Sequence, residues 1–189
     1  MSIPYRQIRA AFVADTLTVY QAYAPAIAAP AVAAQTFVAP FKRERMTWIK
    51  PSFLWMMYRC GWANKPGQER VLAIRITRSG FESGLRESCL SHFDPELHAS
   101  HDEWRARLAT SPVRLQWDPE RDRAGQPLAW RSLQLGLSGS AVTRYVEDWI
   151  VGIDDITDSL ADRRSGAEPL PTERPYPLPD DLVAHIGAS

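Results

Sequence analysis

The chain has little cysteine: only Cys60 and Cys89 occur among its 189 residues. Two thiols are too few for a disulfide framework, and they are not spaced as a CxxC pair. No apolar run approaches the roughly 18 residues that a membrane-spanning helix needs, and the N-terminal segment lacks the apolar stretch of a secretion signal. These absences predict a cytoplasmic protein with reduced thiols and no membrane partner.

Net charge is also absent, because 22 basic residues balance 22 acidic ones. Overall charge therefore does not draw the protein to nucleic acid or to an anionic membrane. Any polyanion would have to bind at a local cluster of cations.

Familiar catalytic and metal-binding motifs are missing as well. The sequence contains no HExxH zinc motif and no GxSxG nucleophile elbow. Cysteine and histidine recur between residues 89 and 101, but their spacing is not that of a standard zinc site, so we expect no metal. The glycine-rich stretch 136–140 leads into an expected helix but lacks the lysine of a P-loop.

The most informative stretch is 45–62, RMTWIKPSFLWMMYRCGW, which holds three of the seven tryptophans together with two arginines and one lysine. An apolar core uses aromatic and methionine side chains but not neighbouring cations, so this segment predicts one wall of a ligand site. The alternative is that Trp55, Met56 and Met57 belong to the core while the cations are solvated.

The pattern of hydrophobic residues predicts an α+β fold with a mainly antiparallel sheet and interspersed helices. The length suits one domain, which we place at residues 1–160, and the proline-rich residues 161–189 are expected to form an extended tail. The expected strands are a hairpin within 6–23 and the segments 46–49, 71–77, 113–117, 132–137 and 151–156. The expected helices are 25–29, 30–37, 53–60, 101–109 and 140–150.

Seven stretches spread over nearly the whole chain carry a family resemblance. They are RQIRA (6–10), TVYQAY (18–23), RMTWIKPSFLWMMYR (45–59), QERVLAI (68–74), WDPERD (117–122), RSLQLGLSG (131–139) and EDWIVGIDDIT (147–157). In these stretches the chain resembles a family of bacterial and fungal proteins, the domain of unknown function 4291. The resemblance implies a single compact domain and carries no activity.

Cationic, hydroxyl and aromatic residues are candidates for binding a nucleotide cofactor. Arg6 and Arg9 lie on the first expected strand, where a guanidinium could hold a pyrophosphate bidentately or form structural ion pairs instead. Ser52 marks a helix N-terminus whose free N–H groups suit an anion, with Lys50 beside it. Trp48 could stack on a flat ring. The expected cofactor-binding residues are Arg6, Arg45, Thr47, Trp48, Lys50 and Ser52.

Glu69 follows a Pro66-Gly67 turn and introduces the expected strand 71–77. A carboxylate at the mouth of a rigid strand can stabilise the positive charge that develops when a glycosidic bond breaks. The alternative is an ion pair with Arg70 or Lys65.

These residues favour a nucleotide-directed transferase. The best analogy is an ADP-ribosyltransferase, which splits NAD, its co-substrate, and passes ADP-ribose to a nucleic-acid or other acceptor. The expected catalytic residues are Glu69, Arg9 and Tyr20. The analogy rests on chemistry and domain size, because no motif of that superfamily is matched and the spacing of Arg9, Ser52 and Glu69 is short.

The alternative is a non-catalytic module that binds single-stranded RNA or a modified base. Its expected contacts are Trp48, Trp55 and Trp62 for bases and Lys50, Arg59 and Lys65 for phosphates. A third interpretation is an interaction protein that forms a homo-oligomer. The first two interpretations require the cations and tryptophans to share one hollow with Glu69.

Overall fold

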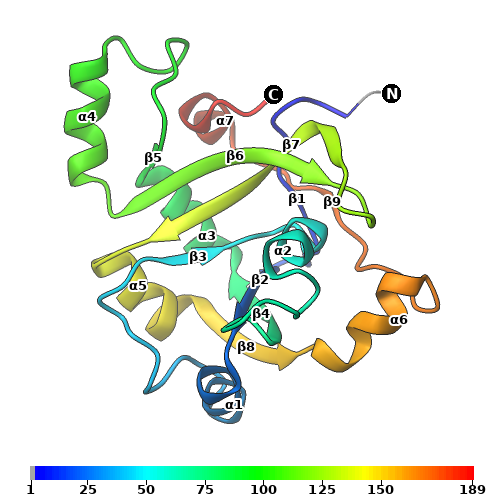
Figure 1. The fold of residues 1–189 in the computed structure, drawn as a ribbon. Helices are drawn as coiled ribbons and strands as arrows, with labels where there is room; N and C mark the ends of the chain where they lie inside the picture. Colours follow the sequence, from blue (N-terminus) through cyan, green and yellow to red (C-terminus); the bar gives the residue numbers. More distant parts are fainter. Residues whose placement is uncertain (1–2) are drawn as a thin grey trace.

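Two β-sheets organise the computed structural model, which describes residues 3–189 of the chain (Figure 1). The three-stranded sheet is antiparallel and has the order β2 (Thr16–Tyr23), β4 (Arg70–Thr77), β8 (Ile150–Asp155). The four-stranded sheet has the order β3 (Thr47–Ile49), β7 (Pro127–Leu137), β6 (Val113–Arg121), β5 (Ser88–Leu90), and its β5–β6 pair is parallel. A short pair, β1 (Arg9–Ala10) and β9 (Arg174–Pro175), joins segments from the two ends of the chain.

Helices connect the strands and cover the sheets (Figure 1). They are α1 (Pro25–Ala34), α2 (Phe53–Cys60), α3 (Arg78–Arg86), α4 (His101–Thr110), α5 (Ser140–Arg144), the π-helical turn η1 (Tyr145–Trp149), the 3-10 turn η2 (Thr157–Ser159), α6 (Leu160–Ser165) and α7 (Asp180–Ile186). This mixture of helices and mainly antiparallel strands confirms the predicted α+β fold. None of the helices within residues 3–189 is long and apolar enough to cross a membrane.

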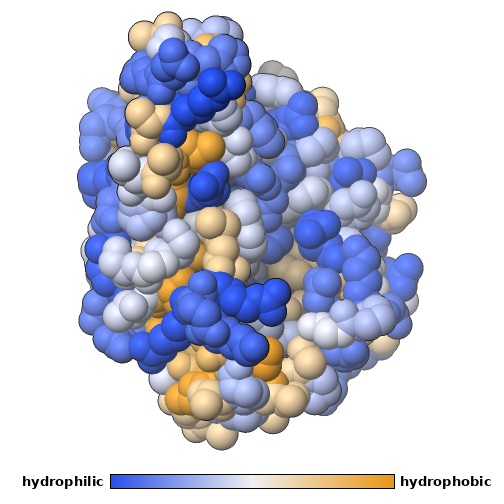
Figure 2. Space-filling model, turned by 60° about the vertical axis from the view of Figure 1, so that its left-hand side comes forward, coloured by the Kyte–Doolittle hydropathy of each residue, from blue (hydrophilic) through white to orange (hydrophobic). Residues whose placement is uncertain are grey.

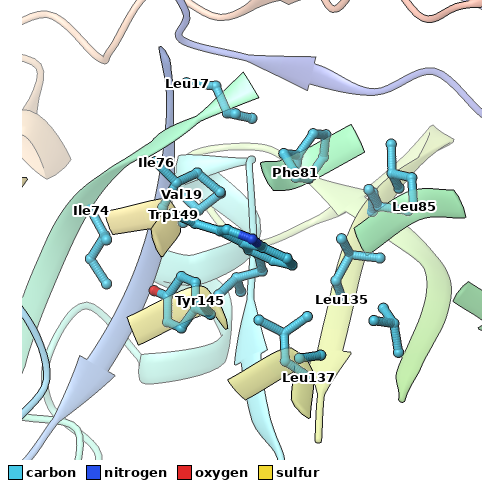
Figure 3. Packing of buried hydrophobic residues seen from close by; sticks show 14 of the residues in the cluster. Leu17, Val19, Ile74, Ile76, Phe81, Leu85, Leu135, Leu137, Tyr145 and Trp149 are labelled. Atoms are coloured by element: carbon cyan, nitrogen blue, oxygen red, sulfur yellow. The ribbon is translucent and has the colours of Figure 1, made fainter. Parts of the chain in front are cut away.

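The main core gathers side chains from both sheets and from α3 around Trp149 (Figure 3). Strand alternation buries Leu17 of β2 and Leu135 and Leu137 of β7 in this core. A Cβ atom at Gly80 would lie 2.4 Å from the Trp149 ring, so α3 can pack here only with glycine at that position.

Helix α2 begins and ends where the sequence predicts. The Trp55 N–H donates to Ser52 Oγ at 3.1 Å, and Gly61 ends the helix in the left-handed conformation with φ 60°. The helix buries Phe53, Trp55, Met56, Met57 and Cys60. The core interpretation of this helix is therefore confirmed, and its two exposed residues are Tyr58 and Arg59.

Some local predictions are wrong. Residues 25–37 do not form two helical pieces, because α1 continues through Pro30, which removes only one backbone hydrogen bond from the helix. The segment 140–150 is not one α-helix, because η1 follows α5 before β8 begins. Helix α3 and the short strand β5 are absent from the predicted elements.

Residues 161–189 contain more structure than the extended tail that their prolines predict. Most of α6 lies in this segment, β9 pairs with β1, and α7 follows. Tyr176, Leu182 and Ile186 are buried in the main core. The C-terminal segment therefore completes the core that the rest of the chain begins.

Candidate functional site

A cavity of about 200 Å³ opens between β2, β3 and the exposed side of α2. We call it the Lys50 cavity. It is lined by Gln21, Ala22, Tyr23, Met46, Thr47, Trp48, Lys50, Met56, Arg59 and Gln68. Its charged lining residues are both cations, and its lining contains no carboxylate.

Lys50 is placed by the contact between the two larger sheets. Directly after β3, its carbonyl accepts a hydrogen bond from Tyr20 N of β2 at 2.8 Å. Pro51 and Ser52 then lead into α2. The Lys50 side chain is thereby held between a strand edge and the helix that follows it.

The Lys50 ammonium is buried, with only 6% of the residue exposed. Burial, together with the nearby charge of Arg59, lowers its pKa to about 8, and the charges of Asp118 and Cys60 oppose part of this change. Nζ donates a long hydrogen bond of 3.4 Å to the Trp48 carbonyl. In the described part of the chain, no salt bridge joins Lys50 or Arg59 to an acid.

Polar side chains on β6 and β7 lie next to Lys50. Gln134 Nε2 donates to Asp118 Oδ2 at 2.6 Å and to Gln116 Oε1 at 2.7 Å. Burial raises the pKa of Asp118, while the Gln134 hydrogen bond and the charges of Arg59, His92 and Lys50 oppose that rise. Asp118 therefore compensates the charges of Lys50 and Arg59 in part, although it does not line the cavity.

A second wall of the cavity is a buried hydrogen-bond network. Gln21 Nε2 lies 2.7 Å from Thr47 Oγ1, 2.9 Å from the Tyr23 hydroxyl and 3.2 Å from the Trp48 carbonyl. The Tyr145 hydroxyl of η1 donates to Gln21 Oε1 at 2.7 Å. This donation fixes the orientation of the amide, so its two N–H groups point towards Thr47, Tyr23 and the Trp48 carbonyl.

An adjoining cavity of about 260 Å³ lies beside the first. We call it the Phe41 cavity, and it is lined by Tyr23, Ile27, Pro40, Phe41, Lys42, Arg45, Met46 and Thr47. Three of these residues, Tyr23, Met46 and Thr47, also line the Lys50 cavity. Figure 2 shows a face of the molecule that is hollowed near its middle, with hydrophilic residues around much of the rim.

The structure brings together four of the expected cofactor-binding residues. Thr47, Trp48 and Lys50 line the Lys50 cavity, and Arg45 lines the Phe41 cavity beside it. Trp55 is different, because it is buried and stacks on Tyr58 with ring centroids 5.4 Å apart. It therefore does not offer the free stacking surface that the RNA-binding interpretation requires.

The other two expected cofactor-binding residues have partners elsewhere. Arg6 forms a salt bridge with Asp94 at 2.8 Å. Ser52 is buried and caps α2, and the neighbouring Phe53 N–H donates to Glu173 Oε1 at 2.6 Å. A carboxyl group of this chain therefore already lies at the helix N-terminus for which we predicted an external anion.

The three expected catalytic residues do not line the Lys50 cavity. Arg9 donates to the Glu173 carbonyl at 3.1 Å, and Tyr20 is buried with its ring edge against Phe53. Glu69 is exposed, accepts a hydrogen bond from Gly67 N at 2.8 Å, and lines a separate cavity of about 620 Å³ with Trp62 and Arg164 among its other lining residues. The structure thus separates Glu69 from the cations with which we expected it to converge.

A pair of carboxyl groups, the buried Glu120 and the partly buried Glu173, is absent from the sequence-based prediction. Burial, with a contribution from the neighbouring Glu120, raises the pKa of Glu173 to about 8, while the Phe53 N–H and Arg9 oppose this rise. Burial also raises the pKa of Glu120. We call Arg9, Glu120 and Glu173 the carboxyl cluster. No local signal marks Glu173, because it lies among prolines 120 residues from the Phe53 N–H that it binds.

Gln21 and Tyr23 are also absent from the prediction, although a signal exists for Gln21. Leu17, Val19 and Gln21 alternate along β2, and all three are buried. An amide at an inward-facing strand position needs hydrogen-bond partners, which marks it as part of a buried polar network.

Comparison with known proteins identifies one family. Residues 7–175 match the model of a family described as a domain of unknown function, which covers most of the chain. No curated protein matches the sequence.

Proposed function

Since the chain belongs to the DUF4291 family, a domain of unknown function, we propose a function from the geometry of the Lys50 cavity: the protein binds a nucleotide through its phosphate. The observation that supports this proposal most is the pairing of Lys50 with Arg59 in a cavity whose lining contains no carboxylate. Charge-assisted hydrogen bonds from an ammonium and a guanidinium are the usual means of holding a phosphate.

The burial of Lys50 adds to this argument. A buried ammonium that forms no salt bridge destabilises the fold unless something else compensates its charge. A phosphate bound in the cavity would supply that compensation and would raise the lowered pKa of Lys50. Tyr23 lines both this cavity and the adjoining Phe41 cavity and offers an aromatic surface for the ring of a nucleotide.

For the reaction, we propose nucleotide-directed transfer of the ADP-ribosyltransferase type, with NAD as co-substrate. Gln68 lines the Lys50 cavity, whereas its neighbour Glu69 lines a separate cavity, so Glu69 can act only on a ligand that extends past Gln68. Transfer requires a carboxylate close to the ribose. The proposal of nucleotide binding does not depend on this second step.

Calorimetric titration tests the binding proposal. NAD, ADP-ribose and AMP are titrated into the wild-type protein, Arg59→Gln and the control Arg43→Gln. Arg59 is exposed and lines the Lys50 cavity, whereas Arg43 is exposed, pairs with Glu147 and lines neither cavity. We expect Arg59→Gln to weaken nucleotide binding about tenfold or more, since hydrogen bonds to charged groups contribute about 1.5–3 kcal/mol, and Arg43→Gln to leave it unchanged. The absence of binding to all three compounds would refute the proposal.

Nicotinamide release from NAD, with total RNA or lysate as acceptor, tests the reaction. We expect release by the wild-type protein and its loss in Glu69→Gln. Turnover that persists in this variant would remove Glu69 from the mechanism. RNA binding without any turnover, with an affinity that falls steeply with salt, would favour the alternative of a non-catalytic RNA-binding module.

A further inference from the structure

We infer that the ligand has two parts and occupies both cavities, with its phosphate in the Lys50 cavity and its flat ring in the Phe41 cavity. This inference rests on the proposed nucleotide binding and adds the class of ligand, a nucleoside monophosphate or a larger molecule that contains one. A hydroxyl group at the boundary between the cavities supplies an additional hydrogen bond to the ligand.

The two cavities are parts of one elongated site. Tyr23, Met46 and Thr47 line both of them. Binding pockets for small molecules usually have volumes of about 300–1,000 Å³. The Lys50 cavity, at about 200 Å³, and the Phe41 cavity, at about 260 Å³, are each below that range and reach it only together.

The Phe41 cavity has the lining that a flat ring needs. Phe41 stacks on Phe37 with ring centroids 4.4 Å apart and meets Tyr23 edge to face at 5.9 Å, so its ring is held in place. Ile27 and Pro40 add apolar surface to the same cavity. Lys42 and Arg45 line it as well, and both are exposed, so the cations lie where the cavity meets solvent.

The network around Gln21 leaves one hydroxyl proton without an acceptor. The Tyr23 hydroxyl and Thr47 Oγ1 are 2.9 Å apart, so one of them donates to the other. Gln21 Nε2 can only donate to them, because its Oε1 already accepts from Tyr145. Burial raises the pKa of Tyr23 to about 12, so its hydroxyl keeps its proton.

The count of protons follows from these contacts. Two hydroxyl groups carry two protons, and the bond between them uses one. Among the residues that the structure describes, the second proton has no acceptor in this network. Because Tyr23 and Thr47 line both cavities, that proton can be donated to an oxygen of a ligand that crosses from one to the other.

The first test compares inorganic phosphate, adenosine and AMP as ligands of the wild-type protein, Arg59→Gln and Phe41→Ala. We expect AMP to bind at least tenfold more tightly than phosphate or adenosine. Phe41→Ala should weaken AMP about tenfold and leave phosphate unchanged, whereas Arg59→Gln should weaken both. If AMP and phosphate bind equally and Phe41→Ala changes neither, the two-part ligand is refuted while the anion site remains. If no compound binds, the proposed function itself fails.

The second test examines the hydroxyl pair with Thr47→Val, Tyr23→Phe and the double variant. Each single variant retains one hydroxyl group and therefore one free proton, so we expect AMP affinity to fall less than threefold. The double variant has no free proton, and its AMP affinity should fall tenfold or more, which is far from additive. An effect equal to the product of the single effects would overturn the proton count.

A control separates this loss from a general loss of stability. The double variant also leaves one Gln21 N–H without a partner, which destabilises the fold. Ile74→Val removes a methyl group from the main core and lines neither cavity. Binding that persists in Ile74→Val at a matched melting temperature, and is lost in the double variant, supports the inference. Equal losses in both would contradict it.

Discussion

The Lys50 cavity and the carboxyl cluster both lie near the start of α2, and they differ in how their ionisable groups are compensated. In the carboxyl cluster, Glu173 accepts from the Phe53 N–H, and Arg9 lies close enough to oppose the rise in its pKa. In the Lys50 cavity, two cations face a space without an acid. A buried carboxyl group that is shifted towards its neutral form and bonded within the chain is part of the fold, whereas a buried ammonium that is only partly compensated beside a cavity indicates a ligand.

The largest expected effect concerns the carboxyl cluster and pH. The pKa of Glu173 is about 8 in the fold, above the usual value of 4.5, so the folded state binds the proton more tightly than the unfolded state. The free energy of unfolding should therefore fall as pH rises from about 4.5 to 8, by on the order of 3 kcal/mol. Glu173→Gln should remove most of this slope in chemical denaturation series, and the exposed control Glu44→Gln should keep it.

The second effect concerns Lys50 and has the opposite sign. Its pKa is about 8 in the fold, below the usual value of 10.5, so the unfolded state binds the proton more tightly. The charge of Lys50 therefore lowers the free energy of unfolding below pH 8, and this loss disappears as pH rises from about 8 to 10.5. We expect Lys50→Met to raise the free energy of unfolding by about 1–3 kcal/mol at pH 7, because it replaces a buried charge with an apolar side chain.

Weaker nucleotide binding by a more stable Lys50→Met would show that Lys50 serves the ligand at a cost to the fold. Denaturation at pH 7 and at pH 10 measures the first property, and calorimetry measures the second. A Lys50→Met protein that is several kcal/mol less stable would instead place Lys50 among the residues that hold the fold together.

The smallest effects compare two arginines from the N-terminal segment. Arg9 lowers the pKa of the buried Glu120 and the partly buried Glu173, so Arg9→Gln should lower the free energy of unfolding by about 1–2 kcal/mol. Arg6 pairs with Asp94 at a partly exposed site, so Arg6→Gln should cost less than about 1 kcal/mol. Thermal and chemical unfolding of the two variants measures the difference. A larger cost for Arg6→Gln would reverse our ranking of the two sites.

The sequence predicts the elements whose signals are local. Ser52 and Gly61 define α2 because capping depends on neighbouring residues, and the β-branched run ending at Thr77 predicts β4. Helix α3 cannot be predicted in this way, because Gly80 and Gly84 disfavour a helix and are needed only for contact with Trp149, far along the chain.

The residues of the candidate site that lie close together in the sequence are also predictable. Thr47, Trp48 and Lys50 share a cavity because they lie on one short segment. Glu69 does not join them, because the turn at Gly67 directs it into the next cavity. Glu173 and Tyr23 depend on contacts between distant segments, and no local pattern reveals those contacts.

The central claim is that Lys50 and Arg59 bind the phosphate of a nucleotide. Its most direct test is the affinity for AMP between pH 7 and 9.5. The phosphate is doubly ionised throughout most of this range, since its second pKa is about 6, so Lys50 is the group of the cavity that titrates. We predict an affinity that falls at least tenfold as pH rises through about 8 to 9, and a weaker, pH-independent affinity in Lys50→Met. An AMP affinity that does not change with pH in the wild-type protein, or that is unaltered in Lys50→Met, would contradict the account.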